Sequence, residues 1–188
     1  DHIGGLDDVI NSDLKIENLW MPKIQTNTKT FEDVLDAVKN KGLKVTAPNK
    51  GDSFEIGKAK CEVMTDSILN KDNLNLSSIV IRLEFENNSF LFMGDAETAN
   101  EKTRTWMKTD VLKVGHHGSN TSSSEDFLKQ INPTYAVIMA GKNNSYGLPK
   151  QKILDRLTKI GAKVYRTDEE GTIMMISNGN NIEVKENT

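Results

Sequence analysis

Apolar residues recur along this chain with two different periods, one typical of helices and one typical of strands. In residues 30–42, the apolar side chains between Phe31 and Val38 follow the i, i+3, i+4, i+7 spacing of an amphipathic helix, and Gly42 suits its end. Similar spacing predicts further helices at about 96–107, 124–131 and 149–160.

Short apolar or alternating stretches predict strands between these helices. The stretches are residues 43–47, 53–56, 60–64, 78–85, 89–93, 111–114, 135–139, 163–166, 171–176 and 181–185. The alternation after Val80 places Arg82 and Glu84 on the outer face of their strand. Because strands and helices alternate in the second half, the pattern predicts an α/β fold in which helices cover sheets, as one domain over residues 1–188.

Composition narrows the possible functions. The 188 residues include 24 Lys and Arg against 27 Asp and Glu, which gives a net charge of −3. A general electrostatic affinity for nucleic acid or anionic lipid is therefore not expected, and any such binding needs a local patch. Cys61 is the only cysteine, which excludes an internal disulfide and a cysteine-based zinc site. No apolar run approaches the length that a bilayer requires.

Two of the three histidines, His116 and His117, are adjacent and lie between glycines directly after the predicted strand 111–114. Imidazole is a ligand for zinc, copper, iron, nickel and manganese, and the end of a strand is a rigid mount for it. The alternative is one structural histidine beside a solvated one. The adjacency of the two rings between glycines favours a functional site.

Asp95 follows the apolar strand 89–93 in a Gly-Asp sequence. It either caps the following helix or offers a carboxylate that can bridge two cations, and the residues alone leave both interpretations open. The hydroxyl-rich segment 119–124 also has two possible interpretations. Ser122 and Glu125 have the spacing of a capping box, whereas backbone N–H groups and hydroxyls at a helix N-terminus also bind anions.

Together these segments resemble the metallo-β-lactamase superfamily, and within it the metallohydrolase domain of ComEC-type competence (DNA-uptake) proteins. Gly-Asp-Ala-Glu at 94–97 and His-His-Gly-Ser at 116–119 are the most specific segments. Residues 1–6, 78–80, 90–97, 110–119, 135–138, 145–147 and 164–171 match in the family's order. The resemblance implies an αββα sandwich, α/β or α+β in class, with two divalent metals, zinc or manganese, at one edge. Such a site activates water for attack on phosphorus or a carbonyl carbon.

On that pattern Asp1, His2, Asp95 and one or both of His116 and His117 are metal ligands, and Asp95 bridges the two metals. The second imidazole of the pair lies near the substrate, and which histidine has which role stays open. Asp1, His116 and His117 are therefore the candidate catalytic residues. The resemblance also implies a pocket lined by Ser119, Asn120 and Thr121.

The sequence departs from the family pattern in two places. It begins inside the metal-binding motif, so we expect it to lack the two leading histidines and the first strands of the sandwich, which leaves a sheet edge available for self-association. It also reads Tyr-Gly-Leu-Pro at 146–149, where the family usually has Tyr-Gly-His-Pro. The side chain of Leu148 cannot bind a metal.

The resemblance thus implies a ComEC-like, metal-dependent phosphodiesterase or nuclease that acts on DNA, specifically single-stranded DNA, during uptake. The missing ligands and Leu148 predict weak or no activity for this chain. Two alternatives stay open: a degenerate, non-catalytic binding domain, and a hydrolase of another substrate such as a choline phosphodiester or a lactone. Relatives of this type work outside the cytoplasm, in secreted or membrane-associated proteins, and the same location is expected here.

Overall fold

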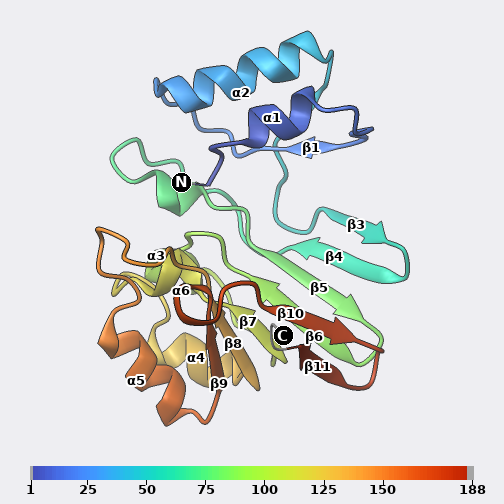
Figure 1. Cartoon of the computed structure of the whole chain (residues 1–188). Coiled ribbons are helices and arrows are strands. Elements are labelled where there is room, and N and C mark those ends of the chain that lie inside the picture. The colour runs from blue at the N-terminus through green and yellow to red at the C-terminus, as the bar shows by residue number, and fades with distance from the viewer. Residues whose placement is uncertain (1, 186–188) are drawn as a thin grey trace. The chain divides into compact units, whose positions relative to one another are not determined.

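The computed structural model describes residues 2–185 (Figure 1). The chain divides into two compact units, Asp1–Pro48 and Asn49–Thr188, and each is described by itself. The prediction of one domain over residues 1–188 stays a prediction. None of the helices among the described residues combines the length and the hydrophobicity that crossing a bilayer requires.

The N-terminal unit contains two helices and two short strands. They are α1 (Leu6–Asn11), β1 (Leu19–Trp20), α2 (Lys29–Asn40) and β2 (Val45–Thr46), and β1 pairs with β2 in parallel. The Thr28 side chain accepts a hydrogen bond from the backbone N–H of Phe31 and so caps α2. The predicted helix at 30–42 is confirmed. Its apolar face and Ile10 of α1 form the small core of this unit, Ile10, Val34, Ala37 and Val38.

The second unit is built on a seven-stranded sheet with the order β3-β4-β5-β6-β7-β8-β9. The strands are β3 (Ser53–Ile56), β4 (Ala59–Val63), β5 (Ile81–Phe85), β6 (Asn88–Phe92), β7 (Val111–Lys113), β8 (Tyr135–Ile138) and β9 (Lys163–Arg166). Neighbouring strands from β3 to β6 are antiparallel, and those from β6 to β9 are parallel. The carboxyl ends of β6, β7 and β8 therefore lie at the same edge of the sheet.

Helices cover one face of this sheet (Figure 1). The helical segments are η1 (Leu74–Ser77), α3 (Thr98–Glu101), η2 (Gly115–Gly118), α4 (Glu125–Ile131), α5 (Gln151–Lys159) and α6 (Thr167–Glu170), η denoting a 3₁₀ helix. Apolar residues of β6, β7 and β8, such as Leu91, Leu112 and Ile138, form the core with Phe127 of α4 and Leu157 of α5. The predicted α/β fold, with helices packed on a sheet, is confirmed.

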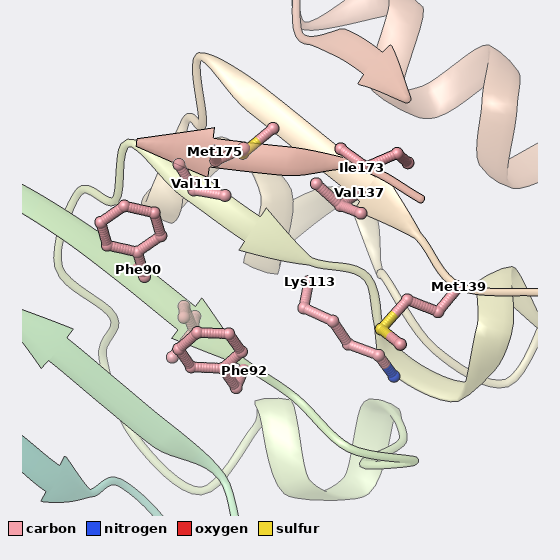
Figure 2. Close-up of a pocket in the computed structure, with 9 residues that line it drawn as sticks. Phe90, Phe92, Val111, Lys113, Val137, Met139, Ile173 and Met175 are labelled. Atoms are coloured by element: carbon pink, nitrogen blue, oxygen red, sulfur yellow. The ribbon is translucent and has the colours of Figure 1, made fainter. Parts of the chain in front are cut away.

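The opposite face of β6, β7 and β8 carries the alternate side chains and is only partly covered. The hairpin β10 (Met174–Ser177) and β11 (Ile182–Lys185) lies over it, and a cavity of about 280 Å³ separates them (Figure 2). The cavity is lined by Phe90, Leu91, Phe92, Val111, Lys113, Val137, Met139, Ile173 and Met175. Phe92 and Met139 are 43% and 50% exposed, so this apolar face is open to solvent at one end.

Two local predictions are wrong. The helix predicted over 96–107 ends at Glu101, because Trp106 turns into the core and its ring N–H donates to the Glu101 carbonyl (2.6 Å). Arg82, predicted to face outward, is buried. Its guanidinium donates to Glu84 (2.8 Å) and to the Thr109 hydroxyl (2.7 Å), and these partners allow a charged group to lie inside.

Candidate functional site

Polar side chains gather where β6, β7 and β8 end. Gly94 and Asp95 follow β6, the Gly115–Gly118 turn follows β7, and Met139 follows β8. The backbone N–H of His116 donates to the carbonyl of Gly94 (3.1 Å), which joins the first two segments. Carboxyl ends of parallel strands are the usual place for ligand sites in α/β folds.

His117 faces the Asp95 carboxylate. Its Nδ1 donates to the backbone carbonyl of Met139 (2.6 Å), because a carbonyl can only accept, and its Nε2 lies 3.5 Å from Oδ1 of Asp95. The Asp95 side chain is buried, and its backbone N–H is held by the Ser78 hydroxyl (3.1 Å). An imidazole whose far nitrogen is held by a hydrogen bond, beside a buried carboxylate, is an arrangement that suits the binding of a divalent transition metal.

His116 faces a different group of residues. Its Nδ1 lies 2.9 Å from the Thr121 hydroxyl and 3.2 Å from Oε1 of Glu97, and its Nε2 is 3.3 Å from the amide nitrogen of Asn75. Since a carboxylate only accepts and an amide nitrogen only donates, the proton lies on Nδ1 and Nε2 accepts. Glu97 is itself fixed by the amide of Asn73 (2.9 Å). The two neighbouring histidines therefore point into separate surroundings, which the sequence had left open.

The backbone of the Gly115–Gly118 segment, called the histidine turn below, is strained. His116 and His117 have φ angles of 47° and 50°, a region that costs a non-glycine residue roughly 1–3 kcal/mol. Gly115 and Gly118 make the turn possible, because a Cβ at these positions would lie 2.8 Å from the carbonyl oxygen of Ala96 and 2.7 Å from Cβ of Pro149. Strain of this kind clusters at functional sites, where it fixes side-chain direction.

The segment after the turn is held by a buried carboxylate. Glu101 accepts hydrogen bonds from the backbone N–H groups of Ser123 (2.5 Å) and Ser124 (3.0 Å), and burial raises the pKa of this carboxyl. Ser122 is fully buried and donates to the Gly115 carbonyl (2.7 Å). The expected Ser122–Glu125 capping box is wrong, since the α4 cap is Ser124, which accepts from Phe127.

The predicted pocket residues lie along the exposed start of this segment. Asn120 and Thr121 are exposed and Ser119 is half-buried. The hydroxyls of Ser119 and Thr121 are 3.2 Å apart, and Thr121 also contacts His116. Their role in substrate binding stays a prediction, and the geometry links it to His116.

Two of the predicted ligands, Asp1 and His2, belong to the start of the chain. Asp1 lies outside the described residues. His2 belongs to the N-terminal unit, where it is exposed and precedes α1. Their metal-binding roles stay predictions. Within the second unit, Asp95 and His117 supply one oxygen and one nitrogen donor, and this donor set fits a divalent cation.

Leu148 lies in a loop attached to the histidine turn. The Asn144 side chain accepts from the Leu148 N–H (3.0 Å) and donates to the Leu148 carbonyl (2.7 Å). The next residue, Pro149, packs against Gly118, and the Lys150 N–H donates to the Gly118 carbonyl (3.0 Å). Leu148, which replaces the family's histidine, is thus directly followed by a residue in contact with the turn that carries His117.

Several residues of the site were not singled out in the sequence. Glu97 is part of the Gly-Asp-Ala-Glu segment, so its spacing from Asp95 was a usable signal. Asn75 lies 41 residues before His116, in a polar stretch that has no distinguishing pattern. Lys113 looked like an ordinary polar residue of a strand.

The sequence of residues 1–142 matches the profile of the Metallo-beta-lactamase superfamily. The chain belongs to this superfamily. ComE operon protein 3 of Bacillus subtilis (strain 168) is 36% identical over 177 residues, which cover 92% of this chain and 23% of that protein. Recombination protein 2 of Haemophilus influenzae is 42% identical over 101 residues, 53% of this chain and 13% of that protein. The predicted resemblance to ComEC-like competence proteins is confirmed.

These relatives are much longer than the chain, which spans about a quarter of ComE operon protein 3. Among solved structures, a variant of CmlA beta-hydroxylase superposes with a TM-score of 0.51 at 13% identity, covering 79% of this chain and 38% of the other. At this identity the likeness shows the fold alone, and it agrees with the mixed α/β architecture.

Proposed function

We propose that this chain is a metal-dependent hydrolase of phosphodiester bonds that acts on single-stranded DNA in competence-type uptake. The observation that carries the proposal is the pairing of Asp95 with Nε2 of His117 at 3.5 Å, with Nδ1 of His117 fixed on the Met139 carbonyl. A carboxylate and an oriented imidazole at the ends of parallel strands are two of the ligands that a catalytic metal centre takes from a protein.

The residues of the site take separate roles. Asp95 and His117, together with Asp1 and His2, would hold the two divalent metals, zinc or manganese. Divalent cations bound there would activate water and neutralise the negative charge that develops on a phosphate. His116, fixed by Glu97 through Nδ1, faces the substrate, and Ser119, Asn120 and Thr121 line its path.

The choice of DNA rests on the relatives. The names of two relatives, Recombination protein 2 and Competence protein ComA of Neisseria gonorrhoeae, concern recombination and competence. A net charge of −3 by itself gives DNA no advantage over small anions. A location outside the cytoplasm and self-association through a sheet edge are parts of the same proposal. The edges of the large sheet among the described residues are β3 and β9.

A second candidate is a binding domain that has lost catalysis. Leu148 favours it, because the loop that carries this residue is attached to the histidine turn at Gly118, and leucine offers no ligand atom. In this case the domain binds a phosphodiester or a partner without cleaving it.

Metal content and hydrolysis, measured on the same preparation, test the proposal. The chain is purified without chelator or a histidine tag, and metal per chain is determined by elemental analysis. Hydrolysis of single-stranded DNA, a choline phosphodiester and a lactone is then compared with that of the Asp95→Asn variant. The proposal is supported if wild-type protein contains metal that Asp95→Asn does not retain, and if wild type cleaves DNA faster than this variant. Absence of metal from the wild-type chain refutes it.

Leu148→His separates the two candidates. Introduced into a form of the protein that extends further at its N-terminus, it should raise DNA cleavage if the site is impaired only at this position. Activity that is already typical of intact relatives without the change excludes the non-catalytic candidate. Retained phosphodiester binding with no cleavage in either form supports that candidate.

A further inference from the structure

Lys113 occupies an unusual place for a lysine. It is the last residue of β7 and, among the described residues that line the apolar cavity, the only charged one. Its side chain runs between Phe92 and Met139, with the amine at the end farther from Met175 (Figure 2). The ammonium group is therefore carried along an apolar wall toward the edge of the sheet where Asp95 lies.

The amine ends on a carbonyl that already serves the site. Lys113 Nζ donates to the backbone oxygen of Gly94 (2.9 Å), and the backbone N–H of His116 donates to the same oxygen (3.1 Å). Gly94 directly precedes Asp95, and His116 directly precedes His117. One carbonyl oxygen thus joins the segment that carries the carboxylate to the turn that carries the imidazole.

Packing alone does not require an ammonium group at this position. Burial lowers the pKa of Lys113, and the negative charge of Asp95 opposes this only in part, so the charged form is held at a cost in free energy. Methionine has nearly the same length and would fill the apolar slot without that cost. What methionine would lose is the donor to Gly94.

We propose that Lys113 is a positioning residue, which fixes the Gly94 carbonyl and thereby the separation of Asp95 from His117. The proposal rests on the proposed metal site. The amine of Lys113 then holds the geometry of the site and is not needed for folding. Loss of an outer hydrogen-bond partner of a metal ligand typically weakens metal affinity about 10–100-fold, and an effect of this size is expected here.

Two substitutions of Lys113 and one control test this role. Lys113→Met removes the donor and the charge, Lys113→Gln keeps an N–H donor without the charge, and Lys60→Met removes an exposed lysine from β4 of the same sheet. Each variant is titrated with Co²⁺, followed by its visible absorption, and its melting temperature is measured without metal. Amide hydrogen exchange of His116 is followed by NMR in the metal-free protein.

The expected pattern separates positioning from folding. Lys113→Met should bind Co²⁺ at least about 10-fold more weakly, with an altered absorption band, faster exchange at His116 and a melting temperature that does not fall. Lys113→Gln should stay closer to wild type, and Lys60→Met should match it. Unchanged or tighter Co²⁺ binding by Lys113→Met overturns the proposal, as does a lowered melting temperature with faster exchange throughout the sheet.

Failure of the metal site itself gives a different result. If wild-type protein binds no Co²⁺, the proposed function fails, and the exchange of the His116 amide decides the role of Lys113 alone. Faster exchange confined to residues 94–96 and 115–118 in Lys113→Met keeps the positioning role, and unchanged exchange refutes it.

Discussion

His116 and His117 are neighbours in sequence, yet their ring nitrogens have different partners. His117 places Nδ1 on the Met139 carbonyl and turns Nε2 toward Asp95, whereas His116 is held by Glu97 and Thr121. Left-handed backbone angles at both residues separate the two rings, which lie at 65° to each other. One histidine is therefore suited to hold a metal and the other to meet a substrate.

This separation predicts different consequences for the two substitutions to asparagine. His117→Asn should weaken metal affinity by more than the roughly 10–100-fold that loss of a ligand's hydrogen-bond partner costs, because it removes the imidazole that the proposed function assigns to the metal. His116→Asn should leave metal affinity near wild type and lower hydrolysis. Co²⁺ titration and DNA cleavage, measured on both variants, check this. Equal loss of metal in both variants would contradict the assignment.

Glu101 predicts a pH-dependent stability. Its carboxylate satisfies two backbone N–H groups, so Glu101→Gln should destabilise the fold by about 1–3 kcal/mol, because an amide offers only one acceptor oxygen. Burial raises the folded-state pKa above the ordinary value of 4.5. The folded protein then binds a proton more tightly than the unfolded chain, so the stability from this group is complete below pH 4.5 and is lost as pH rises through the folded-state pKa.

The measurement is urea unfolding of wild type and Glu101→Gln at a series of pH values. The difference in unfolding free energy between them should shrink as pH rises above 4.5. Glu125→Gln, on the exposed start of α4, is the matched control and should show no such trend. A difference that grows with pH would show that the carboxyl is stabilised in its charged form.

At the level of elements, apolar spacing was sufficient where an element buries one continuous face. It predicted α2, α4 and α5 to within a few residues, because each packs one stripe of side chains on a core. It failed for residues 102–107 and for Arg82. In both cases contacts with residues distant in sequence replace the local pattern. The backbone N–H of Trp106 donates to the Gln130 side chain, and Arg82 donates to Thr109.

The candidate site divides in the same way. The sequence showed that Asp95 and the histidine pair each directly follow an apolar strand, and the family resemblance grouped them. The structure brings them together because β6 and β7 are parallel and end at one edge. The contacts of Asn75 and Lys113 could not be predicted. They join residues that are far apart in sequence, Asn75 with His116 and Lys113 with Gly94. Which histidine faces Asp95 depends on backbone angles that the letters His-His do not encode.

The histidine turn depends on the absence of a side chain at Gly115. A Cβ there would lie 2.8 Å from the Ala96 carbonyl oxygen, so Gly115→Ala should destabilise the protein by about 1–3 kcal/mol and disturb metal binding. Gly141→Ala is the control, because its Cβ would have no neighbour closer than 3.9 Å and its backbone is not left-handed. Thermal unfolding and Co²⁺ titration compare the two. Equal stability of both variants would show that the turn can shift at no cost.

At the level of the whole molecule, the two compact units differ in the size of their cores. The main core cluster of the second unit contains sixteen buried residues, whereas that of the N-terminal unit contains four, Ile10, Val34, Ala37 and Val38. Small cores give little stabilisation against the conformational entropy of the chain. The backbone of the N-terminal unit is therefore expected to open more readily than the central strands of the large sheet.

Hydrogen exchange measures this difference directly. Amides of α2 should exchange at least about tenfold faster than those of β7, after correction for intrinsic rates, since 1.4 kcal/mol in opening free energy corresponds to a factor of ten. The β10–β11 hairpin supplies a control inside the second unit. Among the described residues its two strands form a separate two-stranded sheet, so it should also exchange faster than β7. Protection of α2 equal to that of β7 would show that core size does not set the order of opening. Fast exchange in β10–β11 together with α2 would show that core burial, and not membership of a unit, decides which backbone opens first.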